Sequence, residues 1–185
     1  MDDFNPRIAC IVGQIASGKT TLARYLEQCG FERVREYTTR PIRHPDENSD
    51  LHFVAEEEFD AKARNGFFAA TVEFDAVFGH CAYGVALHDI CSSKLERKVL
   101  VTNPAVVMTL KDAGYRVFVV HLDFDQETVM RRALARGDTP AEIGRRVSSD
   151  EIKFGLLHTG GYVDLTVTDT TLRPYEIATL IRDCT

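Results

Sequence analysis

Residues 13–20, with the sequence GQIASGKT, constrain this chain more than any other stretch, because they match the phosphate-loop pattern G-x-x-x-x-G-K-[ST] in full. The apolar run at residues 7–12 predicts a buried strand before the loop, and residues 21–27 have the spacing of an amphipathic helix after it. Glycines let consecutive backbone N–H groups turn inward around a phosphate chain at a helix N-terminus. We therefore predict a loop that binds the phosphates of ATP between a strand and a helix.

Each position of this loop has an expected role. Lys19 is predicted to reach the β- and γ-phosphates and to act in catalysis, and the Thr20 hydroxyl is predicted to hold Mg²⁺. The predicted ATP-binding residues are Gly13, Gln14, Ile15, Ala16, Ser17, Gly18, Lys19, Thr20 and Thr21. The expected cofactor is thus Mg²⁺, with ATP as the co-substrate.

Length and charge limit the classes of function. The chain has 185 residues, of which 44% are hydrophobic and 27% are charged, as expected for one soluble domain. The net charge of −6 argues against nucleic acid or an anionic membrane as the main partner, and no apolar run approaches the length of a membrane span. We expect a cytoplasmic monomer or homodimer whose partners are ATP and a small phosphorylated acceptor.

Cysteine and histidine give no sign of a metal site in the sequence. The five cysteines are scattered without a C-x-x-C pair, and the six histidines are equally dispersed. We therefore expect free thiols and no zinc site.

The order of predicted elements indicates the fold class. From residue 86 onward, helical and strand patterns alternate, which predicts a parallel sheet covered by helices on both faces. Residues 35–85 interrupt this alternation with β-rich material. The expected architecture is an α/β P-loop three-layer sandwich, with a core at residues 5–34 and 86–185 and an inserted β-rich subdomain. Within that insert, residues 37–43 are polar and broken by a proline, which predicts a loop.

Several motifs in order along the chain resemble guanylate kinase. They are T-T-R-P-I-R at residues 38–43, the segment at residues 51–59, Tyr83-Gly84, Arg132-x-x-x-Arg136-Gly137 and Arg145-Arg146. The resemblance therefore extends over nearly the whole chain. It implies a core, a subdomain that binds a nucleoside monophosphate, and a helical lid at about residues 137–150. The implied reaction is transfer of the γ-phosphoryl group of ATP to that monophosphate with Mg²⁺.

The resemblance also implies roles for individual side chains. Arg40 and Arg43 match the arginines that hold the acceptor phosphate, and Tyr83 matches a tyrosine that also reaches it. Arg136 and Arg146 match lid arginines that act in catalysis by closing over the transferring phosphate. The planar guanidinium suits these roles because it can donate two parallel hydrogen bonds to a phosphate.

The positions that read guanine in this family are altered. Leu51 replaces a second phosphate-binding tyrosine, Glu36 replaces a serine, and Val85 follows Tyr83-Gly84 where serine or threonine is usual. The strand end at residues 101–103 lacks the expected acids, and Asn103 stands where an aspartate would contact guanine, so we assign Asn103 to acceptor binding. Because lost hydrogen bonds to a buried base weaken selection for it, we expect poor discrimination for guanine.

Three functions remain open at this stage. The leading one is a nucleoside monophosphate kinase, with GMP or dGMP as the nearest acceptor. The second is a kinase of the same fold acting on ribose 1,5-bisphosphate or a non-guanine nucleotide, since residues 83–85 and 101–103 resemble ribose 1,5-bisphosphate phosphokinase. The third is a non-catalytic guanylate-kinase-like binding module, against which the intact phosphate loop argues. The acid that replaces the missing aspartate is not identified.

Overall fold

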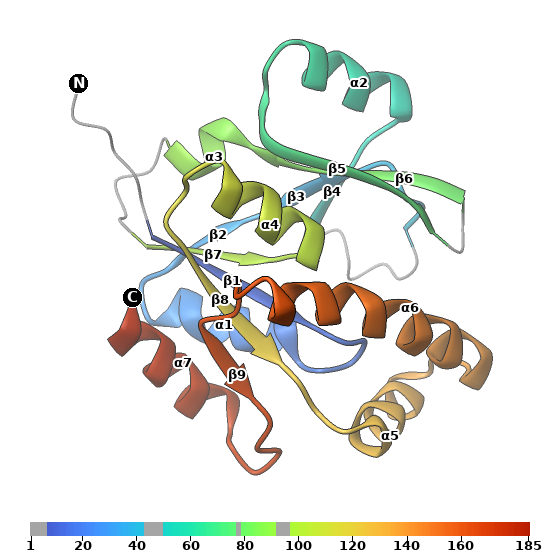
Figure 1. The fold of residues 1–185 in the computed structure, drawn as a ribbon, viewed down its shortest axis with the longest axis vertical. Coiled ribbons are helices and arrows are strands. Elements are labelled where there is room, and N and C mark those ends of the chain that lie inside the picture. The colour runs from blue at the N-terminus through green and yellow to red at the C-terminus, as the bar shows by residue number, and fades with distance from the viewer. Residues whose placement is uncertain (1–6, 43–49, 77–78, 92–96) are drawn as a thin grey trace.

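A five-stranded parallel sheet forms the centre of the computed structural model, which describes residues 7–42, 50–76, 79–91 and 97–185 (Figure 1). Its strand order is β2-β7-β1-β8-β9, and every neighbouring pair is parallel. The bounds are β1 (Arg7–Gly13), β2 (Glu32–Val34), β7 (Arg97–Val101), β8 (Val117–Leu122) and β9 (Leu165–Val167). Since all five strands run the same way, the loops after them gather at one edge of the sheet.

Helices cover both faces of this sheet, as the alternating side chains of β1 require. Ala9 and Ile11 face α1 and α7, whereas Ile8, Cys10 and Val12 face α4 and α6. The bounds of the helices around the sheet are α1 (Lys19–Gln28), α3 (Leu87–Cys91), α4 (Pro104–Asp112), α5 (Gln126–Arg136), α6 (Pro140–Thr159) and α7 (Pro174–Cys184). The predicted α/β three-layer sandwich with a central parallel sheet is confirmed.

A second, four-stranded sheet is formed by the part of the chain between β2 and α3 (Figure 1). Its order is β4-β3-β6-β5, with β3 parallel to β4 and antiparallel to β6. The bounds are β3 (Glu36–Thr38), β4 (Leu51–Phe53), β5 (Phe68–Ala76) and β6 (Gly79–Ala86), with the helix α2 (Glu56–Arg64) between β4 and β5. The β-rich insert is thus a sheet of its own.

The prediction of a loop from residue 37 onward is wrong at its start, because residues 36–38 form β3. Thr38 is fully buried, its hydroxyl donates to the Ala82 carbonyl at 3.0 Å, and its backbone is paired with Tyr83 of β6. Pairing with a strand more than forty residues away therefore overrides the local polar pattern.

The second sheet packs onto the core of the first. Ala70 and Val85 of the second sheet belong to the same buried cluster as Leu100 of β7 and Leu110 of α4. On its other side Phe59 of α2 is buried against this sheet. Among the described residues, no helix is both long enough and apolar enough to cross a membrane.

Candidate functional site

The phosphate loop forms the turn between β1 and α1. Ala16 and Gly18 have left-handed backbone conformations, with φ of 54° and 93°, and Gly18 caps the start of α1. Gly13 has no room for a side chain, because an added Cβ would lie 2.7 Å from the Leu122 carbonyl oxygen and 2.8 Å from Ser17 Oγ. The loop is therefore packed against the end of β8, at a helix N-terminus whose dipole favours an anion.

Lys19 is folded back over the loop. Its ammonium donates to the carbonyl oxygens of Gly13 at 2.8 Å and Gln14 at 2.6 Å. The side-chain oxygen of Gln14 is buried without a hydrogen-bond partner in the described part of the chain, Ile15 packs into the core, and Thr21 is exposed in the first turn of α1. A bound triphosphate would offer the Lys19 ammonium a charged partner in place of backbone carbonyls.

Asp50, an acid that sequence reasoning did not single out, lies beside the predicted magnesium ligand Thr20. The Thr20 hydroxyl donates to one carboxylate oxygen of Asp50 at 3.1 Å, and Arg33 donates to the other at 3.3 Å. Burial lowers the pKa of Arg33, while the charge of Asp50 opposes that shift. Asp50 precedes β4, so no local pattern around the loop could have pointed to it.

Glu36 is a buried carboxyl between the two sheets. It accepts a hydrogen bond from the Thr102 hydroxyl at the end of β7, and only 3% of its surface is exposed. Burial raises the pKa of Glu36 to about 7, although the Thr102 hydrogen bond and the charges of Arg33 and Arg40 lower it. Such a carboxyl is half ionised near neutral pH and can both accept and release a proton. The sequence marked Glu36 only as a departure from guanylate kinase.

The predicted acceptor-binding residues Arg40 and Tyr83 lie near each other in the second sheet. Arg40 follows β3 by two residues, and Tyr83 is paired with Thr38 of that strand. The Arg40 guanidinium lies 5.2 Å from the ring centre of Phe53 and donates to the Pro41 carbonyl at 2.9 Å. Arg43 lies outside the described residues. The roles of these three side chains stay predictions.

Asn103 has a local structural contact that the sequence did not predict. Its side-chain oxygen accepts hydrogen bonds from the backbone N–H groups of Ala105 and Val106 at 3.0 and 3.2 Å, and so caps the N-terminus of α4. Its amide nitrogen is buried and has no hydrogen-bond partner in the part of the chain that the structure describes. Asn103 therefore keeps two donors for a ligand while its oxygen is engaged.

The predicted lid residues lie at the end of α5 and on α6. Arg136 donates twice to Asp138, at 2.8 and 2.5 Å, and Arg132 lies 4.6 Å from the ring centre of Phe124. The two arginines, one turn apart on α5, therefore have different partners. The backbone of Arg146 belongs to α6, but its side chain is not among those that the structure describes. Catalytic roles for Arg136 and Arg146 stay predictions.

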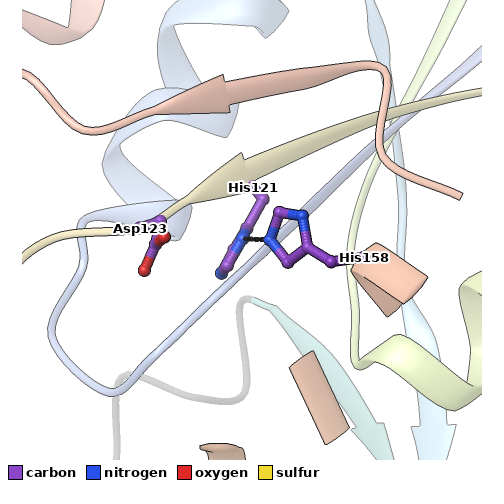
Figure 2. A group of neighbouring side chains, drawn as sticks. All are labelled: His121, Asp123 and His158. Atoms are coloured by element: carbon purple, nitrogen blue, oxygen red, sulfur yellow. Dashed lines mark hydrogen bonds between the residues drawn. The ribbon is translucent and has the colours of Figure 1, made fainter. Parts of the chain in front are cut away.

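Two histidines and an aspartate meet at the end of β8, beside the phosphate loop (Figure 2). His121 Nδ1 lies 2.8 Å from His158 Nε2 of α6, and the His121 ring stacks on Phe154 with ring centres 4.5 Å apart. Burial lowers the pKa of His121 to about 4, so its ring is neutral at pH 7. Two histidines that are 37 residues apart in the sequence are thus brought together by the fold. A His-x-Asp pattern on one strand could have marked His121 and Asp123, but nothing in the sequence pointed to His158.

A phosphate loop after the first strand of a parallel sheet, with Lys19 over it and Asp50 beside Thr20, places this chain in the P-loop class of nucleotide-binding proteins. Residues 7–185 match the family described as chloramphenicol phosphotransferase-like protein, and the chain belongs to this family.

One curated protein and one solved structure are also similar to this chain. A dephospho-CoA kinase from Chlorobium luteolum is 27% identical over 168 residues, which cover 80% of this chain and 77% of the relative. The crystal structure of guanylate kinase from Anaplasma phagocytophilum is similar in fold, with a TM-score of 0.66 and 19% identity, over 97% of this chain and 82% of that one. The family match supports the predicted P-loop kinase class. It does not support the finer expectation of a guanylate kinase, because residues 7–185 match the chloramphenicol phosphotransferase-like family.

Proposed function

We propose that this protein transfers the γ-phosphoryl group of ATP to a hydroxyl group of a small molecule, with Glu36 as the general base. The observation that carries the proposal is the position of Glu36: it accepts a hydrogen bond from Thr102, whose backbone N–H donates at 3.2 Å to the carbonyl of Ile11 in β1, two residues before the phosphate loop. Burial there raises the pKa of Glu36 to about 7. A base works best when its pKa lies near the working pH. The names of the family and of the dephospho-CoA kinase relative are consistent with an acceptor other than a nucleoside monophosphate.

The donor side of the proposed reaction rests on the phosphate loop. Lys19 and the N-terminus of α1 neutralise the phosphates of ATP. Thr20 and Asp50 fit Mg²⁺, because a hydroxyl and a carboxylate oxygen 3.1 Å apart are hard oxygen ligands of the kind this ion prefers. When bound with ATP, Mg²⁺ withdraws charge from the phosphate oxygens. Asp50 thereby supplies the acid that the strand end at residues 101–103 lacks.

A hydroxyl acceptor needs a base in this reaction, whereas a phosphate acceptor does not. A hydroxyl oxygen that attacks the γ-phosphorus must lose its proton, and in this proposal the proton passes to Glu36 while the bond from the γ-phosphorus to the bridging oxygen breaks and ADP leaves. An acceptor phosphate is already an anion and needs no base. It would also be repelled by an ionised Glu36, so a carboxyl at this position favours a neutral acceptor hydroxyl.

A nucleoside monophosphate is the second candidate acceptor, and the burial of Arg40 is the observation that favours it. This arginine is 6% exposed and follows β3, whose Thr38 is paired with Tyr83 of β6, so Arg40 and Tyr83 could hold a phosphate together with Arg43. GMP or dGMP is the nearest nucleotide by resemblance. In this reading residues 35–85 form the acceptor-binding subdomain and residues 137–150 a lid that carries Arg136 and Arg146 toward the transferring phosphate.

Product chemistry tests both candidates in one experiment. Purified protein is incubated with MgATP and each member of a panel of nucleoside monophosphates, sugar phosphates and hydroxyl compounds that includes chloramphenicol. ADP release measures turnover, and phosphorus NMR identifies the products. A phosphomonoester product supports the hydroxyl acceptor, and a phosphoanhydride product supports the nucleotide.

Matched variants assign the residues. Glu36→Gln should abolish phosphomonoester formation, whereas Arg40→Ala should affect mainly phosphoanhydride formation. A phosphomonoester product that Glu36→Gln still makes at the wild-type rate would refute the role of Glu36. Phosphoanhydride as the sole product would refute the hydroxyl acceptor itself.

A further inference from the structure

The cluster of His121, Asp123 and His158 has the composition of a transition-metal site. Each side chain offers one ligand atom, and the three atoms lie within 4.8 Å of one another. Two imidazole nitrogens and one carboxylate oxygen are the donor set of several catalytic zinc and iron sites, which keep further positions open. By contrast, Mg²⁺ is usually bound through oxygen ligands alone, so this cluster differs in chemistry from the pair formed by Thr20 and Asp50.

Backbone structure holds two of these groups in place. His121 is the next-to-last residue of β8, and Asp123 follows two residues later, just after the strand. The two side chains therefore project from the same face (Figure 2). The Asp123 backbone N–H donates to the Val167 carbonyl of β9 at 3.0 Å, which ties the strand end to its neighbour. His158 comes from the last turn of α6 and points toward His121.

The two ring nitrogens of His121 have different surroundings. Its Nδ1 faces His158 Nε2 at 2.8 Å, and its Nε2 is buried with no hydrogen-bond partner among the residues the structure describes. Two nitrogens bound to one ion at about 2.1 Å are separated by about 3.0–3.4 Å, depending on whether the ion is octahedral or tetrahedral. A separation of 2.8 Å is short of this by only a few tenths of an ångström, and His158 is exposed and free to adjust.

We propose that His121, Asp123 and His158 bind one divalent transition-metal ion, of the class of Zn²⁺ or Co²⁺. The ion takes one nitrogen from each ring and one carboxylate oxygen, and its remaining positions are open to water or to an anionic ligand. The site borders the phosphate loop, because Leu122, which lies between His121 and Asp123 in the sequence, is paired with Gly13 of β1. This inference does not depend on the identity of the acceptor.

Absorption spectroscopy with Co²⁺ tests the site on the full chain without nucleotide. Titration should produce visible d–d bands that saturate at one equivalent, without the near-ultraviolet band of cobalt bound to thiolate. That band matters because Cys91 and Cys184 are exposed. Zn²⁺ should displace the cobalt, and excess Mg²⁺ should not.

Variants decide whether these residues are the ligands. His158→Ala and Asp123→Asn should each weaken Co²⁺ binding by about tenfold or more. His88→Ala, an exposed histidine away from the cluster, is the matched control and should bind Co²⁺ like the wild type. His158 is exposed, so its substitution keeps the test valid even if His121→Ala fails to fold, which circular dichroism would reveal. Absence of binding, binding that survives His158→Ala, or a thiolate band would each overturn the proposal.

Discussion

Replacing Glu36 by Gln should stabilise the protein at neutral and alkaline pH. Gln keeps the size of the side chain and an acceptor for the Thr102 hydroxyl, but it carries no charge to bury. In the folded protein burial raises the pKa of Glu36 from 4.5 to about 7. This difference corresponds to about 3 kcal/mol of stability that the wild type lacks once the carboxyl is ionised. For a domain of this size, we expect a rise in Tm of about 6–12 °C at pH 8.

The sign of the pH dependence follows from the order in which the two states lose the proton. Below pH 4.5 Glu36 is protonated in both the folded and the unfolded state. The wild type and Glu36→Gln should therefore have nearly the same free energy of unfolding there. Between pH 4.5 and about 7 the unfolded chain releases the proton first, which lowers the stability of the wild type as pH rises. Above about pH 7 both states are ionised and the stability difference is constant.

Urea denaturation at a series of pH values from 4 to 9 measures this difference. The gain in free energy of unfolding for Glu36→Gln should grow from near zero at the acid end to about 3 kcal/mol at the alkaline end. Glu57→Gln is the matched control, because Glu57 is exposed on α2 and its substitution should change stability little. A stability difference that is the same at every pH would refute the burial argument.

Three further substitutions test the proposed phosphate site. Lys19→Ala should lower the turnover number by about 100-fold or more, measured as ADP release, and a turnover number within about threefold of the wild type would contradict its catalytic role. Asp50→Asn should raise the Mg²⁺ concentration needed for half-maximal activity by about tenfold, while unchanged Mg²⁺ dependence would remove Asp50 from the metal site. Arg136→Lys should lower kcat by about tenfold with little change in acceptor KM, because lysine lacks the guanidinium fork; an effect on acceptor KM alone would place Arg136 outside the transition state.

Local pattern was sufficient for much of the fold. Residues 7–12 were predicted as a strand and form β1 (Arg7–Gly13), and residues 21–27 were predicted as a helix and lie within α1 (Lys19–Gln28). Such elements are readable because apolar spacing and caps act within one or two turns of the chain. Tyr37 and Thr38 were wrongly predicted to be in a loop, because the pairing of β3 with β6 lies beyond any local window.

The phosphate loop was the one part of the candidate site that the sequence determined alone. Its glycines, lysine and threonine are consecutive, so spacing carries the chemistry. The same holds for the class of protein, which the family match supports independently.

The rest of the site was decided by tertiary structure. Asp50 reaches Thr20 across 30 residues, Glu36 reaches Thr102 across 66, and His121 reaches His158 across 37. Each pair joins elements that are distant in the sequence: α1 and the residue before β4, β3 and the residue after β7, and β8 and the last turn of α6. No sequence interval encodes which of them meet. The physical reason is that burial and proximity set both the pKa of a carboxyl such as Glu36 and the ligand set of a metal, and both are properties of the packed fold.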